Sequence, residues 1–532
     1  MEKVLVANRG EIALRIFRAA RALGIGTVAV VAPDDRGALH ARSADDVVEI
    51  SSYLHSEEHV RAAKQSGADA IHPGYGFLSE NGDFAEAVEA AGLTWIGPPP
   101  DALRAGGDKL VAKETAARAG VPTIPEVGEP PLIVKAAAGG GGRGMRVVRA
   151  RDELADALEA ARREAKAAFG DDRVYLERYL ERPRHVEIQL LADEHGTVLA
   201  LGERDCSVQR RHQKVLEESP SPALDADLRA RMSDAAIRFA QAIGYRSAGT
   251  AEFVLEGREF FFLELNGRIQ VEHPVTEAVT GMDLVQWQIR IARGEALPAC
   301  NTLLQGHAVE VRLYAEDPRS FLPQAGRIET LRLPASIRVD AGVAEGDEVG
   351  TGYDPMIAKL IASGGTRDDA LDRLAAALAE TEVAGVTTNL PFLRWLVAHP
   401  VLRAGEATTA FLTEHPPLSA PPPRVADAIW RGAFRLNLPS PAPKPPPDVD
   451  AAAHEHGPGE EPSALTAPMP GTVIKVNVQA GDRVTARDPL VVLEAMKMET
   501  PLVSPYDATV RAVHVAEGDR VAGGALLVEL EE

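Results

Sequence analysis

Short apolar runs alternate with amphipathic stretches from the start of the chain. Val4–Val6 is apolar, apolar positions between Ile12 and Leu23 recur at helical spacing, and Thr27–Val31 is apolar again. Short continuous apolar runs indicate buried strands, and a spacing of three to four residues indicates a helix. The pattern therefore predicts a βαβ unit at the beginning of the chain.

A similar alternation continues further along. A strand is expected at Ala70–Ile71 and a helix from about Lys109. The pattern then predicts a strand at 132–135, a helix at 152–169 and strands at 174–177, 185–191 and 198–201. After about Gly326 it changes to short strands with one helix near 368–380. The mixture predicts α/β and α+β domains.

A hairpin is predicted between Gly249 and Glu272, turning near Gly257 and continuing as a long extended segment. A three-residue turn would place Glu252 opposite Phe262 and diagonal to Glu264. Because strand side chains alternate, one face would carry the polar groups of Glu264, Asn266, Arg268, Gln270 and Glu272. Carboxylate and amide oxygens suit Mg²⁺ that bridges to phosphates. A solvated strand face is the alternative interpretation.

A glycine-rich loop at 136–144 follows Lys135 and contains Arg143. Glycines allow backbone N–H groups to approach phosphate oxygens, so the loop could cover a nucleotide. It lacks the Gly-Lys-Ser/Thr ending of a Walker loop, and a flexible surface loop is the other interpretation. The basic cluster at 203–214 is either a local anion site or a solvated loop.

Residues 471–494 and 508–531 form an internal repeat, offset by 37 positions. The repeat predicts two equivalent β-halves, with Lys497 at a hairpin just after the first half. Met496 and Met498 flank this lysine. Apolar side chains at a turn favour a surface that other proteins handle.

Composition narrows the function classes. The formal net charge of −21 argues against a nucleic-acid surface, and no apolar run approaches the length of a membrane span. Cys206 and Cys300 cannot form a disulfide framework and fit a reducing compartment, so a cytoplasmic location is expected. Eight prolines within 439–463 predict a linker, whose ends would lie about 25–30 Å apart as coil.

The sequence resembles two protein families. Ala495-Met496-Lys497-Met498 resembles the biotinyl-acceptor segment of biotin carboxyl carrier proteins, over about 464–532. Residues 1–435 resemble biotin carboxylase, an ATP-grasp enzyme, through the strings 72–81, 135–148, 203–214, 268–276 and 306–318. The resemblance implies an N-terminal βαβ domain (1–110), an ATP-grasp domain (111–325), a C-terminal mixed domain (326–437), a Pro-rich linker (438–463) and an all-β biotinyl/lipoyl-type carrier domain (464–532).

The resemblance also implies roles for individual residues. Glu272 would be the base, Lys214, Arg268 and Val271 would position bicarbonate, and Arg312 would face biotin. Mg²⁺, with Mn²⁺ as an alternative ion, would be held by Glu252, Glu264 and Asn266. ATP would be bound by Lys109, Lys135, Gly141, Gly142, Glu177, Arg178, Tyr179, Leu180, His185 and His212. Gly267 departs from the family, which commonly has threonine or proline there.

By this resemblance the chain is the α-subunit of a biotin-dependent acyl-CoA carboxylase that carboxylates biotin on Lys497. A separate carboxyltransferase β-subunit and biotin protein ligase would be its partners in a hetero-oligomer. Such α-subunits usually have a β-rich docking domain between the carboxylase and the carrier, and this chain has little room for one there. The alternative is another ATP-grasp carboxylate–amine ligase with a lipoyl-type tail.

Overall fold

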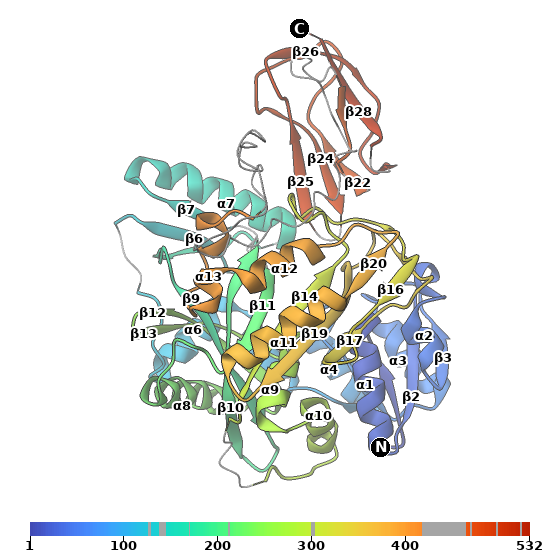
Figure 1. Cartoon of the computed structure of the whole chain (residues 1–532), viewed down its shortest axis with the longest axis vertical. Helices are drawn as coiled ribbons and strands as arrows, with labels where there is room; N and C mark the ends of the chain where they lie inside the picture. The colour runs from blue at the N-terminus through green and yellow to red at the C-terminus, as the bar shows by residue number, and fades with distance from the viewer. Residues whose placement is uncertain are drawn as a thin grey trace, which may run out of the picture.

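The structure is a computed structural model. It describes residues 1–125, 129–137, 145–169, 171–210, 213–298, 304–417, 464–468, 471–495, 498–521 and 524–531. Figure 1 shows the chain from its N-terminus in blue to the carboxyl-terminal β-domain in red, which forms a separate lobe.

The first sheet is parallel, with the strand order β3-β2-β1-β4-β5. Its strands are β1 (Lys3–Val6), β2 (Gly26–Val31), β3 (Asp46–Glu49), β4 (Ala70–His72) and β5 (Thr94–Trp95). The accompanying helices are α1 (Gly10–Ala22), α2 (Leu39–Ser43), α3 (Ser56–Ser66), α4 (Gly82–Ala90) and α5 (Pro100–Gly107). The predicted βαβ opening is confirmed by β1, α1 and β2.

An eight-stranded antiparallel sheet forms the centre, in the order β13-β12-β9-β10-β11-β14-β19-β17. The strands are β9 (Arg184–Ala192), β10 (Val198–Arg210), β11 (Gln213–Ser219), β12 (Ser247–Glu256), β13 (Glu259–Asn266), β14 (His307–Tyr314), β17 (Arg338–Ala341) and β19 (Met356–Gly364). This sheet runs across the position near 325 where the sequence suggested a domain boundary.

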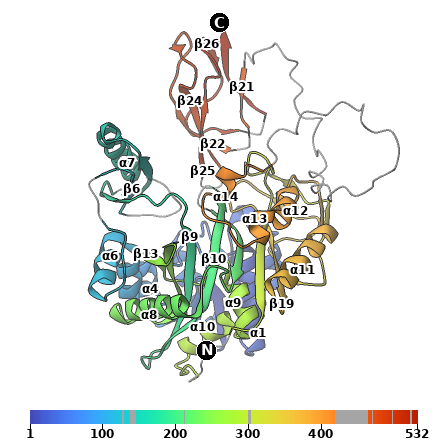
Figure 2. The same ribbon diagram turned by 60° about the vertical axis from the view of Figure 1, so that its left-hand side comes forward.

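Helices cover both faces of the β14–β19 part of the sheet (Figure 2). Val309 and Val311 pack into the same apolar core as Leu371 and Leu374 of α11 (Arg367–Glu380). Ala308, of opposite parity, packs with α9 (His273–Thr280). The intervening polar residues of β14 therefore face α9. Two further helices near the sheet are α8 (Ala226–Ala242) and α10 (Leu284–Ala292).

The β12–β13 hairpin differs from the sequence prediction in register and in length. Glu256 pairs with Glu259, so the turn has two residues, and Gly257 adopts φ +62° there. A bulge between Glu252 and Phe253 places Glu252 directly opposite Glu264, not opposite Phe262. Strand β13 ends at Asn266, so the extended segment predicted to reach 272 is wrong.

A smaller antiparallel sheet precedes the central one. Strands β6 (Leu132–Ala136), β7 (Arg146–Val148) and β8 (Val174–Arg178) pair in the order β7-β6-β8, and α7 (Leu154–Phe169) packs on them. Helix α6 (Lys109–Arg118) begins at its Asp108 cap, whose carboxylate accepts from the N–H groups of Leu110 and Val111. The strands and helices predicted for this region are confirmed.

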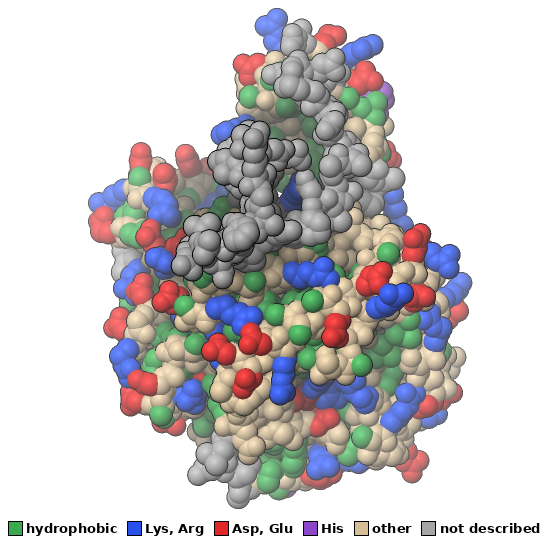
Figure 3. All heavy atoms as spheres, viewed as in Figure 1, with side chains coloured by type: hydrophobic (Ala, Val, Ile, Leu, Met, Phe, Trp, Pro, Cys, Tyr) green, Lys and Arg blue, Asp and Glu red, His purple; other side chains and the backbone are tan. Residues whose placement is uncertain are grey.

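Beyond 326 the chain forms short strands and α11, as predicted, but also the nine-residue strand β19 and the helices α12, α13 and α14, which were not predicted. The remaining elements are β15 (Gly326–Arg327), β16 (Thr330–Arg332), β18 (Glu348–Val349), β20 (Glu382–Ala384), α12 (Leu390–Ala398), α13 (Pro400–Arg403) and α14 (Phe411–Glu414). Among the described residues, no helix is both long and apolar enough to cross a membrane. Acidic and basic side chains are interspersed over the face in Figure 3.

The carboxyl-terminal β-domain reproduces the sequence repeat. Strands β22 (Gly471–Val476), β23 (Arg483–Val484) and β24 (Pro489–Ala495) correspond to β26 (Ala508–Val513), β27 (Arg520–Val521) and β28 (Leu526–Glu531). With β21 (Ala464–Thr466) and β25 (Met498–Val503) they form two sheets, β21-β28-β26-β23 and β25-β24-β22-β27. Each half thus contributes a strand to the other half's sheet, and the predicted equivalence is confirmed.

The contacts at the centre of this domain are reciprocal. The N–H of Gly481 donates to the carbonyl of Val510, and the N–H of Gly518 donates to the carbonyl of Val473, both at 2.7 Å. The side chains of Val473 and Val510 are buried in one core. The halves therefore stabilise each other rather than folding as separate units.

This equivalence predicts matched effects of two substitutions. Val473→Ala and Val510→Ala should each lower the local free energy of unfolding by about 2 kcal/mol, because each leaves a similar space in the same core. Val503→Ala, at a position 40% exposed, is the control and should cost under about 0.5 kcal/mol. Hydrogen exchange of this domain's amides in the full chain measures all three; markedly unequal effects at 473 and 510 would contradict the reciprocal packing.

Candidate active site

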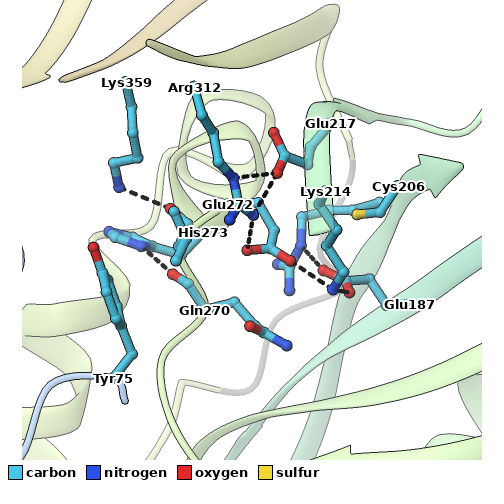
Figure 4. Close-up of polar contacts among 12 residues, drawn as sticks. Tyr75, Glu187, Cys206, Lys214, Glu217, Gln270, Glu272, His273, Arg312 and Lys359 are labelled. Carbon is cyan, nitrogen blue, oxygen red and sulfur yellow. Dashed lines mark hydrogen bonds and ion pairs between the residues drawn. The ribbon is translucent and has the colours of Figure 1, made fainter. Parts of the chain in front are cut away.

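Glu272 lies at the centre of the buried charges, immediately before α9. Its side chain is 1% exposed, and Pro274 in the first turn fixes where the helix begins. One carboxylate oxygen accepts from Nζ of Lys214 at 2.7 Å and the other from a guanidinium nitrogen of Arg312 at 3.0 Å (Figure 4). Burial alone would raise the pKa of Glu272, but Lys214 and Arg312 outweigh it and hold the pKa well below its ordinary value.

Lys214 binds three carboxylates at once. Its Nζ lies 2.5 Å from Glu187, 2.8 Å from Glu252 and 2.7 Å from Glu272. Burial opposes a charged amine, yet these acids raise the pKa of Lys214 well above its ordinary value. The residue is therefore an ammonium ion that joins β9, β12 and the start of α9.

Arg312 on β14 is shared between two acids. Its Nε donates to Glu217 on the neighbouring strand β11 at 2.6 Å, and a terminal nitrogen donates to Glu272. Arg204 on β10 donates at 2.5 Å to Glu187, the same carboxylate that Lys214 contacts. Arg204 is fully buried, so this part of the 203–214 basic cluster is a strand interior and not a solvated loop.

Carboxylate and amide side chains gather where β12 and β13 meet. The amide nitrogens of Asn266 and Gln270 both donate to one oxygen of Glu252, at 2.8 and 3.0 Å. Arg268 binds the amide oxygens of the same Asn266 and Gln270, at 2.8 and 2.7 Å. The polar group that the sequence predicted is thus assembled, although through a turn after β13 rather than along a straight strand.

Two further residues extend this group toward α6 and β9. Glu264, directly opposite Glu252, lies 3.3 Å from Nζ of Lys109. Nε2 of His185 lies 2.8 Å from Glu252. Burial lowers the pKa of His185, but the neighbouring Glu252 outweighs it and raises the pKa above its ordinary value. His185, Glu187 and Glu252 bring potential ligand atoms within 4.8 Å of one another.

Two lysines, one on β6 of the smaller sheet and one on α6, lie against Glu177 of β8. Nζ of Lys135 and Nζ of Lys113 each lie 2.7 Å from an oxygen of Glu177. Burial would raise the pKa of Glu177, and the two lysines hold it below its ordinary value. Arg178 ends β8, and its guanidinium bonds Glu256; Tyr179 and Leu180 follow, with Leu180 buried.

Four residues predicted for the site, Gly141, Gly142, His212 and Lys497, lie outside the described residues. The backbone around Lys497 is described up to Ala495 and again from Met498, and these two residues are paired across the β24–β25 hairpin. Gly267, the departure from the family pattern, donates its N–H to Glu80 at 3.1 Å. A Cβ there would lie 2.7 Å from Leu103 Cδ2, so a larger residue would require that side chain to move.

The main-chain carbonyl of Val271 accepts from Nζ of Lys359 at 2.7 Å. Lys359 also lies 3.1 Å from Glu11, which accepts from the hydroxyl of Tyr75 at 2.5 Å. This chain of contacts fixes the backbone beside Glu272 to the first sheet. Sequence reasoning missed Lys359.

Lys113, Arg204 and Glu217 were likewise not predicted as site residues. Lys113 stands four positions after Lys109 on α6, which is a signal for a shared helix face. Arg204 is part of a basic cluster that was noticed, and nothing in its sequence indicates burial. Glu217 reaches Arg312 across 95 positions, a pairing that only the sheet creates.

Comparison with known proteins places this geometry in a family. Family models match in succession as "Biotin carboxylase, N-terminal domain" (1–103), "Carbamoyl-phosphate synthase L chain, ATP binding domain" (108–300), "Biotin carboxylase C-terminal domain" (310–414) and "Biotin-requiring enzyme" (463–530). The last model covers the repeat domain. These matches favour the biotin carboxylase interpretation over another ATP-grasp ligase.

Individual relatives agree. A biotin carboxylase of Halalkalibacterium halodurans is 47% identical over 78% of this chain and 98% of its own length. The mitochondrial methylcrotonoyl-CoA carboxylase subunit alpha of Arabidopsis thaliana is 48% identical over 78% of this chain, which spans 61% of that relative. The biotin carboxylase domain of Hydrogenobacter thermophilus 2-oxoglutarate carboxylase, solved with MgADP, ADP and bicarbonate, has a TM-score of 0.76 and 44% identity, covering 78% of this chain and 98% of that one. The chain belongs to the biotin carboxylase family.

Proposed function

We propose that this chain uses ATP and bicarbonate to carboxylate biotin carried on its own Lys497. One observation carries the proposal: Glu272 is an ionised, buried carboxylate held between Lys214 and Arg312 on a biotin carboxylase fold. The presence of a biotin/lipoyl-type domain in the same chain supplies the acceptor.

Glu272 would act as the base. Bicarbonate is a weak nucleophile, and removing its proton as it attacks the γ-phosphate of ATP makes the attack feasible. Lys214, Arg268 and the backbone at Val271 would position the anion, and the positive charges of Lys214 and Arg268 would stabilise the charge that develops on its oxygens. Arg312 would face the biotin ring when the carrier arrives. Exclusion of water from this buried centre would protect the labile carboxyphosphate product.

ATP would lie between the smaller sheet and the β12–β13 hairpin. Its phosphates would draw Lys109 and Lys135 away from Glu264 and Glu177, to which they are paired here. Gly141 and Gly142 would approach the phosphates, while the segment from Glu177 through Arg178 and Tyr179 to Leu180, with His185 and His212, would bind the rest of the nucleotide. This assignment follows from the family and from the lysine positions.

Mg²⁺ fits the donors at the hairpin. Glu252, Glu264 and Asn266 offer carboxylate and amide oxygens, the hard ligands that Mg²⁺ prefers, and Mn²⁺ accepts the same set. The ion would neutralise charge on the nucleotide phosphates. Covalently attached biotin would supply a ring nitrogen that accepts the carboxyl group.

The wider assembly is also part of the proposal. The chain would be the α-subunit of an acyl-CoA carboxylase, working in the cytoplasm with a separate carboxyltransferase β-subunit as a hetero-oligomer. Biotin protein ligase would modify Lys497. Acetyl-, propionyl- and methylcrotonyl-CoA stay open as acyl substrates, because selectivity belongs to the transferase. The domains would be 1–110, 111–325, 326–437, 438–463 and 464–532.

Substituting Lys497 separates biotin attachment from ATP cleavage. Lys497→Arg should abolish avidin-reactive protein and the biotin mass increment, because arginine offers no amine for the amide bond. ATP cleavage with free biotin should stay unchanged, since the charged centre is intact. Intact mass and ADP release measure both, and an avidin signal that persists in the variant would refute Lys497 as the acceptor.

Removing the base should remove the bicarbonate-dependent reaction. Glu272→Gln is expected to lower bicarbonate-dependent ADP release by about a hundredfold or more, because the amide cannot take the proton. Its matched control is Glu382→Gln, an exposed acid paired with Arg332 on the surface, which should retain full activity. ADP release that ignores bicarbonate in the wild type would rule out the proposed reaction.

A further inference from the structure

Glu217 and Glu310 are two buried acids next to Arg312, and the proposed reaction gives neither of them a role. Glu217 on β11 is directly paired with Glu310 on β14, and both side chains are fully buried. Val309 and Val311 point into the core under α11, so Glu310 and Arg312, which alternate with them, face α9. Two carboxyl groups thus lie side by side on the wall behind Glu272.

The oxygens of this pair are poorly satisfied. Within the described part of the chain, neither carboxylate oxygen of Glu310 has a hydrogen-bond partner, and Oε2 of Glu217 has none. A buried ionised carboxylate without partners costs several kcal/mol, and two adjacent ones repel each other. A proton retained by the pair removes one charge and supplies a hydrogen-bond donor.

The charged and titratable groups around the pair come from each neighbouring element. They are Cys206 on β10, Lys214 on β11, Arg312 on β14, Lys359 on β19 and Glu272 at the start of α9. Burial raises the pKa of Glu217 to about 7 against the opposing effect of Arg312. Burial likewise raises the pKa of Glu310 well above its ordinary value, against the opposing effect of Lys359.

We propose that Glu217 and Glu310 form a positioning pair that competes with Glu272 for the guanidinium of Arg312. Arg312 already touches both sides, with Nε on Glu217 and a terminal nitrogen on Glu272. The pair therefore sets how firmly Arg312 holds the base. This inference rests on the proposed function for the role assigned to Glu272.

The competition depends on where protons lie. Above a pH of about 7, Glu217 is ionised and draws Arg312 toward itself, while Glu310 keeps its proton. As the pH falls through about 7, Glu217 takes up a proton from solvent and loses its hold on the guanidinium. Arg312 then binds Glu272 alone and makes it a weaker base. The reaction should therefore slow on the acid side through Glu217.

Infrared difference spectroscopy tests the pair directly. The C=O stretching band of a protonated buried carboxyl should be present in the wild type at a pH of about 9, where Glu217 is ionised and Glu310 keeps its proton. It should be lost in Glu310→Gln and retained in Glu272→Gln. This readout needs no catalysis, so it decides the pair even if the chain shows no bicarbonate-dependent ADP release, a result that would count against the proposed function instead. A wild-type spectrum without the band would overturn the inference.

The pH profile of ADP release with free biotin tests the competition. Glu217→Gln should lower kcat about tenfold, the size of a one-unit change in the pKa of a base, and should lose the ionisation near 7. Bicarbonate itself titrates in this range, so the comparison with wild type isolates the protein group. Glu382→Gln should keep the wild-type profile. A Glu217→Gln enzyme that folds, by circular dichroism and thermal unfolding, yet keeps both kcat and profile would refute the competition.

Discussion

The ammonium group of Lys214 is the contact on which the candidate active site depends. It holds Glu187, Glu252 and Glu272 within 2.8 Å of one nitrogen, in a region with almost no exposed surface. Three buried carboxylates without that cation would repel one another, and loss of one partner of a buried ion pair typically costs about 3–5 kcal/mol. The same ammonium, with Arg312, keeps Glu272 ionised, which is the state that the proposed base needs in order to accept a proton.

The central sheet explains why these charges can be buried at all. Alternate residues of β14 and β19 face opposite sides, so apolar side chains fill the core under α11 while Arg312 and Lys359 face α9. The neighbouring strands β12, β9, β10, β11, β14 and β19 contribute buried charged side chains to one polar layer, and α9 packs against the β10–β19 part of it. Stability and chemistry are therefore divided between the two faces of one sheet.

Much of this could be predicted from local pattern. The βαβ opening, the 37-residue repeat and the polar residues near the hairpin were all readable because period and spacing determine them. The register of the β12–β13 hairpin could not be predicted. The polar and apolar alternation around Glu252 indicates neither the two-residue turn nor the bulge. The continued strand was wrong for another reason: Pro274 is a helix-start signal that the polar alternation obscured.

Long-range pairs escaped sequence reasoning for a physical reason. Arg312 meets Glu217, and Lys359 meets Val271, only after segments distant in sequence become neighbours. Single residues such as Arg204 carry no local signal of burial, since arginine is mostly exposed in proteins. The resemblance to a family supplied most of the proposed roles, and the charge network explains why those residue types are needed.

The central claim is that a buried carboxylate activates bicarbonate for direct attack on phosphorus. Following ¹⁸O from labelled bicarbonate tests it most directly. If a bicarbonate oxygen becomes bonded to the γ-phosphorus, the phosphate released during biotin-dependent turnover will contain ¹⁸O. Phosphate that forms at the same rate without the label, its new oxygen coming from water, would contradict the account.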